Sequence, residues 1–299
     1  MLDLAIIVVS YNTEALLRAC LAAIPAACGD LTSRTWVIDN VSSDESAEMV
    51  RREFPEVSLT VAPSNLGFSR ANNLALADPE ARAARFQLLL NPDTEPHPGS
   101  LAELVRFMDS HPDAGACGPK LLNTDGSIQR NGAKFPGLLR DFLSVTGLRR
   151  LAMRRYEVAL GYGREDFDQL VEVDQVSGAC LMVRREVLDQ VGPLDERFFM
   201  FFEEIEWCWR IRRAGWTVYY VPEAIVTHHW MGSVKQHSRR MTDQLFRSQL
   251  LYYKKTSGPL TVLGIRGVMA LGLLKNQLLH TGVAVKRGLR RIGLLPKRP

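Results

Sequence analysis

The sequence predicts an α/β protein with a doubly wound, mostly parallel sheet and a basic helical extension at its carboxyl end. Short, fully apolar runs rich in β-branched residues alternate with segments of helical periodicity, and the links between them are short. Apolar runs of this kind are typical of strands buried on both faces. The charges are also uneven, because eleven basic residues and no acidic residue follow Asp243.

Four cycles of strand and helix make up the amino-terminal part of the chain. The predicted strands are residues 4–9, 36–38, 57–61 and 86–90. One predicted helix runs through Ile24 and ends at Pro25, one is capped by Ser43 and runs to about Phe54, one covers about Ser69 to Ala77, and one runs from Pro98 to about Met108. Alternation with such short links favours parallel strands.

The pattern becomes less regular after about residue 114. The sequence predicts a hairpin turn at 123–127, a helical or irregular stretch over 137–170, a strand over 171–183, a helix over 203–214 stopped by Gly215, strands over 216–221 and 224–227, and helix from about 239. We therefore expect one α/β domain over residues 1–240 and a basic helical extension over 241–299.

The charge distribution separates an acidic body from a basic tail. The whole chain carries a formal charge of +4, so residues 1–243 carry −7. A basic tail indicates an anionic partner. The acidic body does not fit a nucleic-acid-binding protein.

The cysteines and the amino terminus indicate a cytoplasmic protein. The five cysteines are widely spaced, form no CxxC pair and often lie in apolar runs, which predicts reduced, buried thiols. Asp3 precedes a very short apolar run without a cationic region before it, which does not match a signal peptide.

Four polar clusters follow the predicted strands, at residues 10–12, 39–40, 63–67 and 91–93. One such cluster indicates only a turn, but ligands bind beyond the carboxyl ends of strands in an open parallel sheet. The chain has neither a GxGxxG fingerprint nor a GxxxxGK[ST] loop. A phosphate must therefore be held in another way, and Asp93 is placed to carry a divalent cation.

Aromatic residues surround three carboxylates in the segment 198–210, namely Glu203, Glu204 and Glu206. Acidic residues are stabilised in a first helical turn, and Glu206 can pair with Arg210 at i,i+4. Glu204 has no such partner, because Cys208 occupies its i+4 position. Partial desolvation by aromatic surface raises the pKa of a carboxylate and makes it a better general base.

His228 follows a short strand and has two interpretations. A single histidine is often structural, but beside a metal-binding Asp93 it becomes a further metal ligand or a phosphate contact.

These motifs together resemble family 2 glycosyltransferases of the GT-A fold, which is Rossmann-like, and within them the rhamnosyltransferase-like branch of bacterial surface polysaccharide biosynthesis. The matching stretches are Val8–Asn12, Val37–Asp44, Asn65–Asn73, Leu88–Thr94, Gly118–Gln129, Ser177–Arg184, Glu203–Arg210, and His228 with Ser233. They run in the expected order and cover residues 3 to about 235.

The resemblance implies roles for individual residues. The nucleotide-sugar site would comprise Ser10, Tyr11, Asn12, Asp39, Asn65, Gly67, Asn91 and Asp93; the metal ligands would be Asp93 and His228; the acceptor or sugar pocket would contain Gly178, Ala179, Trp207 and Arg210; and the catalytic carboxylates would be Glu204 and Glu203. Asp39 would contact the nucleotide base. The family usually has Asp where Glu204 stands, which leaves Glu203 a rival base, and the Asn-Pro-Asp motif holds one acid of the usual pair.

We expect from this an inverting glycosyltransferase that uses Mg²⁺ or Mn²⁺, with dTDP-L-rhamnose as donor and a lipid-linked sugar as acceptor. A UDP-hexose or UDP-galactofuranose donor on the same fold is one alternative. A sugar-nucleotide-binding or membrane-scaffold protein without turnover is another.

The end of the chain predicts a membrane-surface helix. Residues 260–274 are too short for a span of about 20 residues and are interrupted by Arg266. Leu278, Gly282, Val285, Leu289 and Ile292 form a narrow apolar stripe flanked by cations. Such a helix lies on an anionic membrane, here the inner face of the plasma membrane, unless the stripe packs on the body of the protein.

Overall fold

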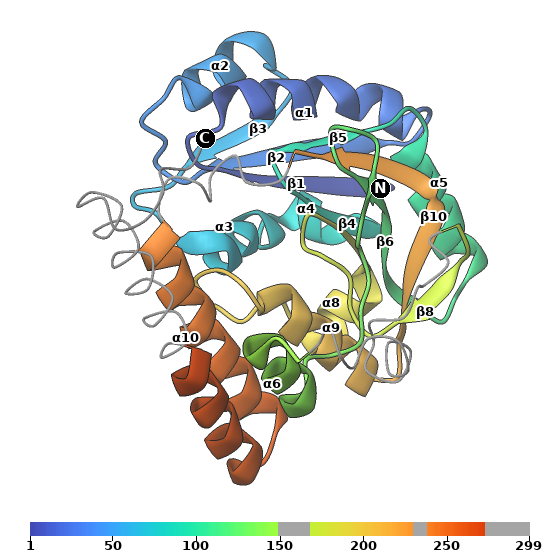
Figure 1. The fold of residues 1–299 in the computed structure, drawn as a ribbon. Helices are drawn as coiled ribbons and strands as arrows, with labels where there is room; N and C mark the ends of the chain where they lie inside the picture. Colours follow the sequence, from blue (N-terminus) through green and yellow to red (C-terminus); the bar gives the residue numbers. More distant parts are fainter. Residues whose placement is uncertain (149–167, 230–237, 273–299) are drawn as a thin grey trace, which may run out of the picture. The chain divides into compact units, whose positions relative to one another are not determined.

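The structure is a computed structural model that describes residues 1–148, 168–229 and 238–272 (Figure 1). The chain divides into two compact units. Of the described residues, the first unit contains 1–135, 168–229 and 238–249, and the second contains 136–148 and 250–272.

The first unit is built on one mixed sheet. Its strands are β1 (Leu4–Ser10), β2 (Ser33–Asp39), β3 (Ser58–Val61), β4 (Phe86–Leu90), β5 (Thr94–Pro96), β6 (Ala114–Leu122), β7 (Ile128–Gln129), β8 (Val171–Val173), β9 (Cys180–Arg184) and β10 (Thr217–His228). The order is β3-β2-β1-β4-β9-β6-β10-β5, with β7 paired to β6 and β8 to β10. β9 runs antiparallel between β4 and β6, but more residues pair in parallel than in antiparallel ladders. The predicted mostly parallel α/β sheet is confirmed.

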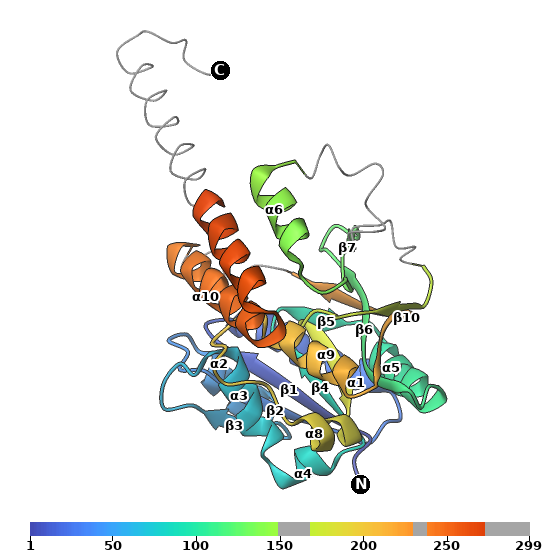
Figure 2. The same ribbon diagram turned by 90° about the horizontal axis from the view of Figure 1, so that it is seen from below.

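Helices cover both faces of this sheet. They are α1 (Glu14–Cys28), α2 (Ser46–Glu53), α3 (Gly67–Leu76), α4 (Pro79–Ala83), α5 (Ser100–Ser110), α8 (Arg185–Val191) and α9 (Glu203–Arg213). α1, α2 and α5 contribute to the apolar cluster on one face, and α3, α4, α8 and α9 to the cluster on the other (Figures 1 and 2).

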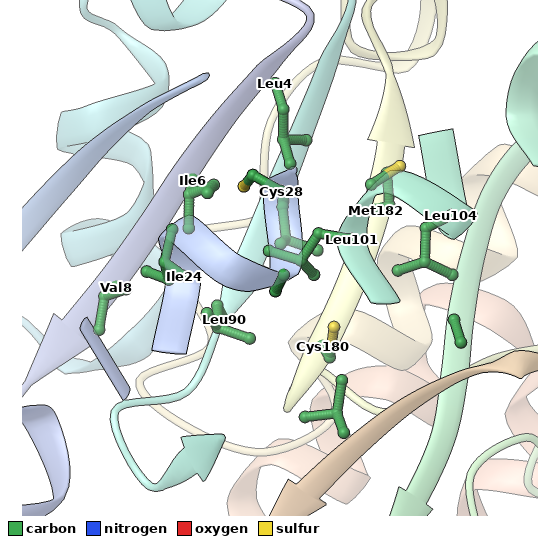
Figure 3. Packing of buried hydrophobic residues seen from close by; sticks show 14 of the residues in the cluster. Leu4, Ile6, Val8, Ile24, Cys28, Leu90, Leu101, Leu104, Cys180 and Met182 are labelled. Carbon is green, nitrogen blue, oxygen red and sulfur yellow. The ribbon is translucent and has the colours of Figure 1, made fainter. Parts of the chain in front are cut away.

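The core follows from the alternation of side chains along buried strands. Leu4, Ile6 and Val8 of β1 point into the cluster beneath α1 and α5, where they meet Ile24 and Leu101 (Figure 3). The intervening residues of β1 pack into the opposite cluster. A strand that is apolar on both faces is therefore explained by two helical layers. All five cysteines are buried and free, as the sequence predicted.

The strand register brings the polar clusters to one edge. Ser10 pairs with Asp39, Asp39 pairs with Val61, and Val8 pairs with Leu90, all in parallel ladders. The loops after β1, β2, β3 and β4 consequently emerge side by side.

One predicted helix end is wrong. α1 continues past Pro25 to Cys28, because Gly29 donates its N–H to Pro25 O and the buried Ala27 and Cys28 pack into the core. The burial of this last turn outweighs the hydrogen bond that proline cannot make.

The predicted strand over 171–183 is also wrong. β8 and β9 are separate strands with different partners, joined by a loop in which Ser177 donates its N–H to Asn131 Oδ1 at 2.8 Å. Conversely, the two strands predicted over 216–227 are one strand, β10, whose register shifts between Val221 and Ile225.

The second unit is helical in its described residues. α6 (Leu138–Thr146), the end of α10 (Ser238–Thr256) and a helix over 259–272 form it. Leu138 and Val145 of α6 pack against Gly264 and Gly272, and Tyr253 donates to Asp141 Oδ2 at 2.6 Å. In the part of the chain described, we find no helix with the length and hydropathy needed to cross a bilayer. The predicted amphipathic stripe over 278–292 lies outside the described residues.

Candidate active site

Side-chain amides lock the loops at the sheet edge together. Asn12 adopts a left-handed backbone with φ of 54°, and its Oδ1 accepts the N–H of Ser43 at 2.6 Å. Asn40 Oδ1 accepts the N–H of Leu66 at 2.7 Å, and Asn40 Nδ2 donates to Gly67 O at 3.2 Å. The loops after β1, β2 and β3 are thus held in a fixed geometry.

Asp39 ends β2 as a buried carboxylate with one oxygen satisfied. Its Oδ1 accepts the N–H of Ser42 at 2.9 Å, while its Oδ2 is buried without a hydrogen-bond partner. An unsatisfied buried acceptor is costly. A donor group on a bound ligand would remove that cost.

Asp93 and His228 meet at the same edge. Asp93 Oδ1 lies 3.3 Å from His228 Nε2, and both side chains are almost fully buried. The opposite ring nitrogen, Nδ1, is 2.6 Å from Gln129 Oε1, and the Gln129 amide itself donates to Asn123. Because an amide oxygen only accepts, Nδ1 carries a proton and Nε2 faces the carboxylate.

This arrangement fits a divalent cation. A neutral imidazole would turn the lone pair of Nε2 towards a carboxylate, which is favourable only when a positive charge, a proton or a metal ion, lies between them. Among the described residues, no group of three or more His, Cys, Asp and Glu side chains gathers at one point. Asp93 and His228 would therefore supply two ligands, and Mg²⁺-type ions take their remaining oxygens from water and substrate phosphates.

A strained turn presents the second set of carboxylates. Phe201 and Phe202, the two residues before α9, both have a left-handed backbone, with φ of 70° and 67°. Bulky residues rarely adopt this conformation, and it persists only where the surroundings enforce it. Ser248 Oγ, on α10, donates to Met200 O at 2.7 Å and is one such restraint.

Gly67 provides another restraint on this turn. Phe68 donates its N–H to Phe199 O at 2.6 Å, and Gly67 has φ of +76°. A Cβ at position 67 would lie 2.2 Å from that same carbonyl oxygen. Only glycine allows this approach, so the loop that Asn40 holds also holds the turn before α9.

Glu203 and Glu204 begin α9 in a desolvated environment. Burial raises the pKa of Glu203 well above its usual range, and the neighbouring charge of Glu204 raises it further. Burial raises the pKa of Glu204 to about 6. The Oε2 atom of each residue is enclosed without a hydrogen-bond partner. Both carboxylates consequently hold a proton more strongly than an exposed glutamate does.

Gly178 and Ala179 lie between the two sets of carboxylates. A Cβ at Gly178 would be 3.5 Å from both Glu204 Cβ and the Phe68 ring. Ala179 O accepts the N–H of Asn91 at 2.9 Å. The loop before β9 thus touches α9 on one side and, on the other, the loop after β4 that carries Asn91 and Asp93.

Trp207 and Arg210 hold α9 against the segment that follows α8. Trp207 is fully buried and donates to Gly192 O at 2.9 Å. Arg210 pairs with the buried Glu206 at 3.0 Å, which confirms the predicted i,i+4 pair, and donates to Pro193 O. These contacts anchor the helix to the segment after α8, and a role of the two residues in the acceptor or sugar pocket stays a prediction.

The remaining predicted residues lie at the sheet edge in different environments. Ser10 is buried with its Oγ 3.0 Å from Thr13 Oγ1, Asn65 Oδ1 accepts the N–H of Gly67 at 3.0 Å, and Tyr11 and Asn91 are partly exposed. Sequence reasoning missed the positioning roles of Gln129 and Ser248. Gln129 lies in a stretch that matched the family, but a residue contact across the sheet leaves no pattern in a single sequence.

The family comparison covers most of the chain. The family profile described as "Glycosyltransferase like family 2" matches residues 3–246. The N-acetylglucosaminyl-diphospho-decaprenol L-rhamnosyltransferase of Mycobacterium tuberculosis is 31% identical over 236 residues, 76% of each chain. The dTDP-rhamnosyl transferase RfbF of Shigella flexneri is 24% identical over 74% of this chain and 67% of its own.

Solved structures share the fold at low identity. GalNAc-T7 with UDP, GalNAc and Mn²⁺ aligns with a TM-score of 0.60 and 14% identity. The alignment covers 85% of this chain but only 48%, about half, of GalNAc-T7. The mannosyltransferase PcManGT from Pyrobaculum calidifontis, with GDP-Man and Mn²⁺, aligns with a TM-score of 0.55 and 16% identity over 95% of this chain and 80% of its own. The fold is GT-A, and the chain belongs to glycosyltransferase family 2.

Proposed function

We propose that this protein is an inverting, metal-dependent glycosyltransferase that moves L-rhamnose from dTDP-L-rhamnose to a lipid-linked sugar. Two relatives carry rhamnosyl transfer in their names, and one of these names specifies an N-acetylglucosaminyl-diphospho-decaprenol acceptor. The acceptor class for this chain is accordingly a sugar linked through diphosphate to a polyprenol.

The observation that carries the proposal is the environment of Glu204. Its pKa near 6 lets it be ionised at neutral pH and still accept a proton effectively. Glu204 removes the proton from the acceptor hydroxyl while that oxygen attacks the anomeric carbon. The bond from this carbon to the diphosphate breaks on the opposite side, so the configuration inverts. Glu203 beside it is the rival base.

The donor is held at the opposite set of carboxylates. The free Oδ2 of Asp39 accepts the imide N–H of a thymine ring, which satisfies a buried acceptor. Asp93 and His228 would hold the cation, and a divalent ion there would supply charge stabilisation to the departing diphosphate. Ser10, Tyr11, Asn12, Asn65, Gly67 and Asn91 complete the donor site, and Gly178 and Ala179 lie towards the sugar.

A UDP-sugar is the second candidate donor, because the imide N–H that Asp39 reads is the same in uracil and thymine. GalNAc-T7, whose structure contains UDP, shares the fold. The ring methyl group and the sugar must therefore distinguish the two donors.

One assay tests the proposal. Purified protein is incubated with dTDP-L-rhamnose, UDP-galactose, UDP-galactofuranose or GDP-mannose, each with Mg²⁺ and a short-chain N-acetylglucosaminyl-diphospho-lipid, and the released nucleoside diphosphate is measured. We expect acceptor-dependent release from dTDP-L-rhamnose and, by NMR, a product whose anomeric configuration is opposite to that of the donor. Release of nucleoside diphosphate only from a UDP-sugar would identify that UDP-sugar as the donor in place of dTDP-L-rhamnose. No release from any of the four would support a binding protein without turnover.

Residues 1–240 would form the catalytic domain and 241–299 an extension that keeps the enzyme at the inner face of the plasma membrane. The basic tail supports this placement, because a polyprenol-linked acceptor is met at the bilayer surface.

A further inference from the structure

The helix over residues 259–272 is apolar on two faces. Ile265 and Val268 are buried within the second unit. Leu260, Leu263 and Leu271 are 84%, 66% and 48% exposed and recur at helical spacing on the outer side. A helix on the surface of a water-soluble unit normally carries polar residues there, and a helix apolar all round is normally covered by protein or lipid.

Cations adjoin this outer stripe. A cavity of about 460 Å³ lies where the end of α10 meets the following helix, lined by Lys254, Ser257, Pro259, Val262, Leu263 and Arg266. Across residues 1–148, 168–229 and 238–272, neither Lys254 nor Arg266 has a carboxylate within 4.0 Å. No acidic residue follows Asp243 in the sequence to supply one. The cavity therefore combines two uncompensated cations with an apolar wall.

We propose that this surface, defined as Lys254, Leu260, Leu263 and Arg266, docks on an anionic phospholipid bilayer. The ammonium and guanidinium groups bind headgroup phosphates, and the two leucines enter the boundary between headgroups and acyl chains. The charge complementarity selects a bilayer over a neutral protein surface. The inference rests on the membrane placement proposed above and deepens it by naming the residues of the extension that touch the bilayer; it holds for any sugar donor and does not involve the stripe at 278–292.

Vesicle binding of the full-length protein tests the surface. Co-sedimentation is measured with phosphatidylcholine vesicles and with vesicles containing 30% phosphatidylglycerol, at low and high salt. The variants are Lys254→Gln with Arg266→Gln, and Leu260→Ser with Leu263→Ser. Arg51→Gln with Arg52→Gln is the charge-matched control, and Val61→Ser with Leu74→Ser replaces two exposed apolar residues of the first unit.

We expect the double glutamine variant to lower the partition coefficient on anionic vesicles about thirtyfold, since each basic residue near an anionic surface contributes about fivefold. The double serine variant should lower it about tenfold. Both control pairs should bind as the wild type does. Added inorganic phosphate at constant ionic strength should not compete, and competition at low millimolar concentration would assign the cavity to a free anion and overturn the proposal.

Residues 273–299 of the same chain are the other occupant to test. If they cover the stripe, the double serine variant will lower the melting temperature and bind vesicles normally, which would overturn the proposal. Transfer to a water-soluble acceptor is measured in parallel. If the wild type transfers no sugar to this acceptor, the proposed function is wrong. If transfer is normal and both variants bind vesicles as the wild type does, only the proposed surface is wrong.

Discussion

The sheet edge and the turn before α9 hold their carboxylates in different surroundings. At the edge, Asp39 accepts a backbone N–H through Oδ1, although its Oδ2 is buried without a partner, and Asp93 faces an imidazole. At the turn, Glu203 and Glu204 each leave an oxygen enclosed without a partner. The edge places a carboxylate beside an imidazole, where a cation fits, whereas desolvation at the turn raises the pKa of both glutamates. A transferase needs both, because a cation at the edge would offset the charge of an anionic donor and a carboxylate at the turn can accept a proton.

Removing the charge at the edge should have the largest effect. Asp93→Asn should lower turnover by about 10³-fold or more, because cation-assisted stabilisation of a leaving diphosphate contributes several kcal/mol. A chelator should abolish the activity of the wild type, and added Mg²⁺ or Mn²⁺ should restore that activity. Asp30→Asn, an exposed aspartate elsewhere, is the control, and circular dichroism checks the fold. Full activity in excess chelator would show that the edge does not use a metal.

Removing the proton acceptor at the turn comes next. Glu204→Gln should lower kcat by about 10²–10⁴-fold with little change in donor affinity, because the amide keeps the shape but cannot take a proton. Glu203→Gln should cost much less. Steady-state kinetics at varied donor concentration separate the effect on kcat from the effect on the KM for the donor. A larger loss of kcat in Glu203→Gln than in Glu204→Gln would make Glu203 the base.

The contact between the two regions can be broken at Gly67. Gly67→Ala should destabilise the fold by about 2–4 kcal/mol, since it adds a left-handed alanine and a close contact with Phe199 O. Gly126→Ala is the matched control: φ there is +79°, but a Cβ meets nothing within 4 Å. It should cost about 1 kcal/mol. If denaturant titrations show the same loss in the free energy of unfolding for Gly67→Ala and Gly126→Ala, the turn before α9 can move to accommodate the added methyl group.

The pH dependence of stability should show the smallest effect. The pKa of Glu204 is raised from 4.5 to about 6 in the fold, so the folded state binds this proton more tightly than the unfolded chain does. Its stabilising contribution is complete below about pH 4.5 and is lost as the pH rises through about 6. At pH 8 the free energy of unfolding of Glu204→Gln should therefore exceed that of the wild type by on the order of 2 kcal/mol, and the variant should melt several degrees higher. At pH 4 the two proteins should be equally stable. A constant difference across this range would argue against desolvation.

Local patterns in the sequence predict most of the fold and part of the site. Apolar strands with polar residues at their carboxyl ends place Ser10, Asp39 and Asn91 at one edge, because parallel register follows from short crossover links. Periodicity cannot predict that Cys180–Arg184 inserts antiparallel between two distant strands, or that Val171–Val173 pairs elsewhere.

The chemistry around Glu204 was only half predictable. Aromatic neighbours in sequence indicated desolvation, and the raised pKa agrees with that. The family resemblance implied a pocket role for Trp207, whose ring is packed in the core. The left-handed Phe201 and Phe202 could not be foreseen, since the hydrogen bonds that hold the preceding Phe199 and Met200 come from Phe68 and Ser248, which are distant in sequence.

The position of β9 has a consequence for the order of assembly on the ribosome. β3, β2, β1 and β4 can pair as soon as residue 90 has emerged, whereas β6 must wait for Cys180–Arg184 to bridge it to β4. Until then β4 is an open edge strand, the kind of edge that recruits wrong partners. The loops of the nucleotide side are therefore synthesised and paired first, and the turn before α9 is added to a half that is already folded. Slow translation between residues 90 and 184 would prolong the exposure of that edge and lower the yield of native protein.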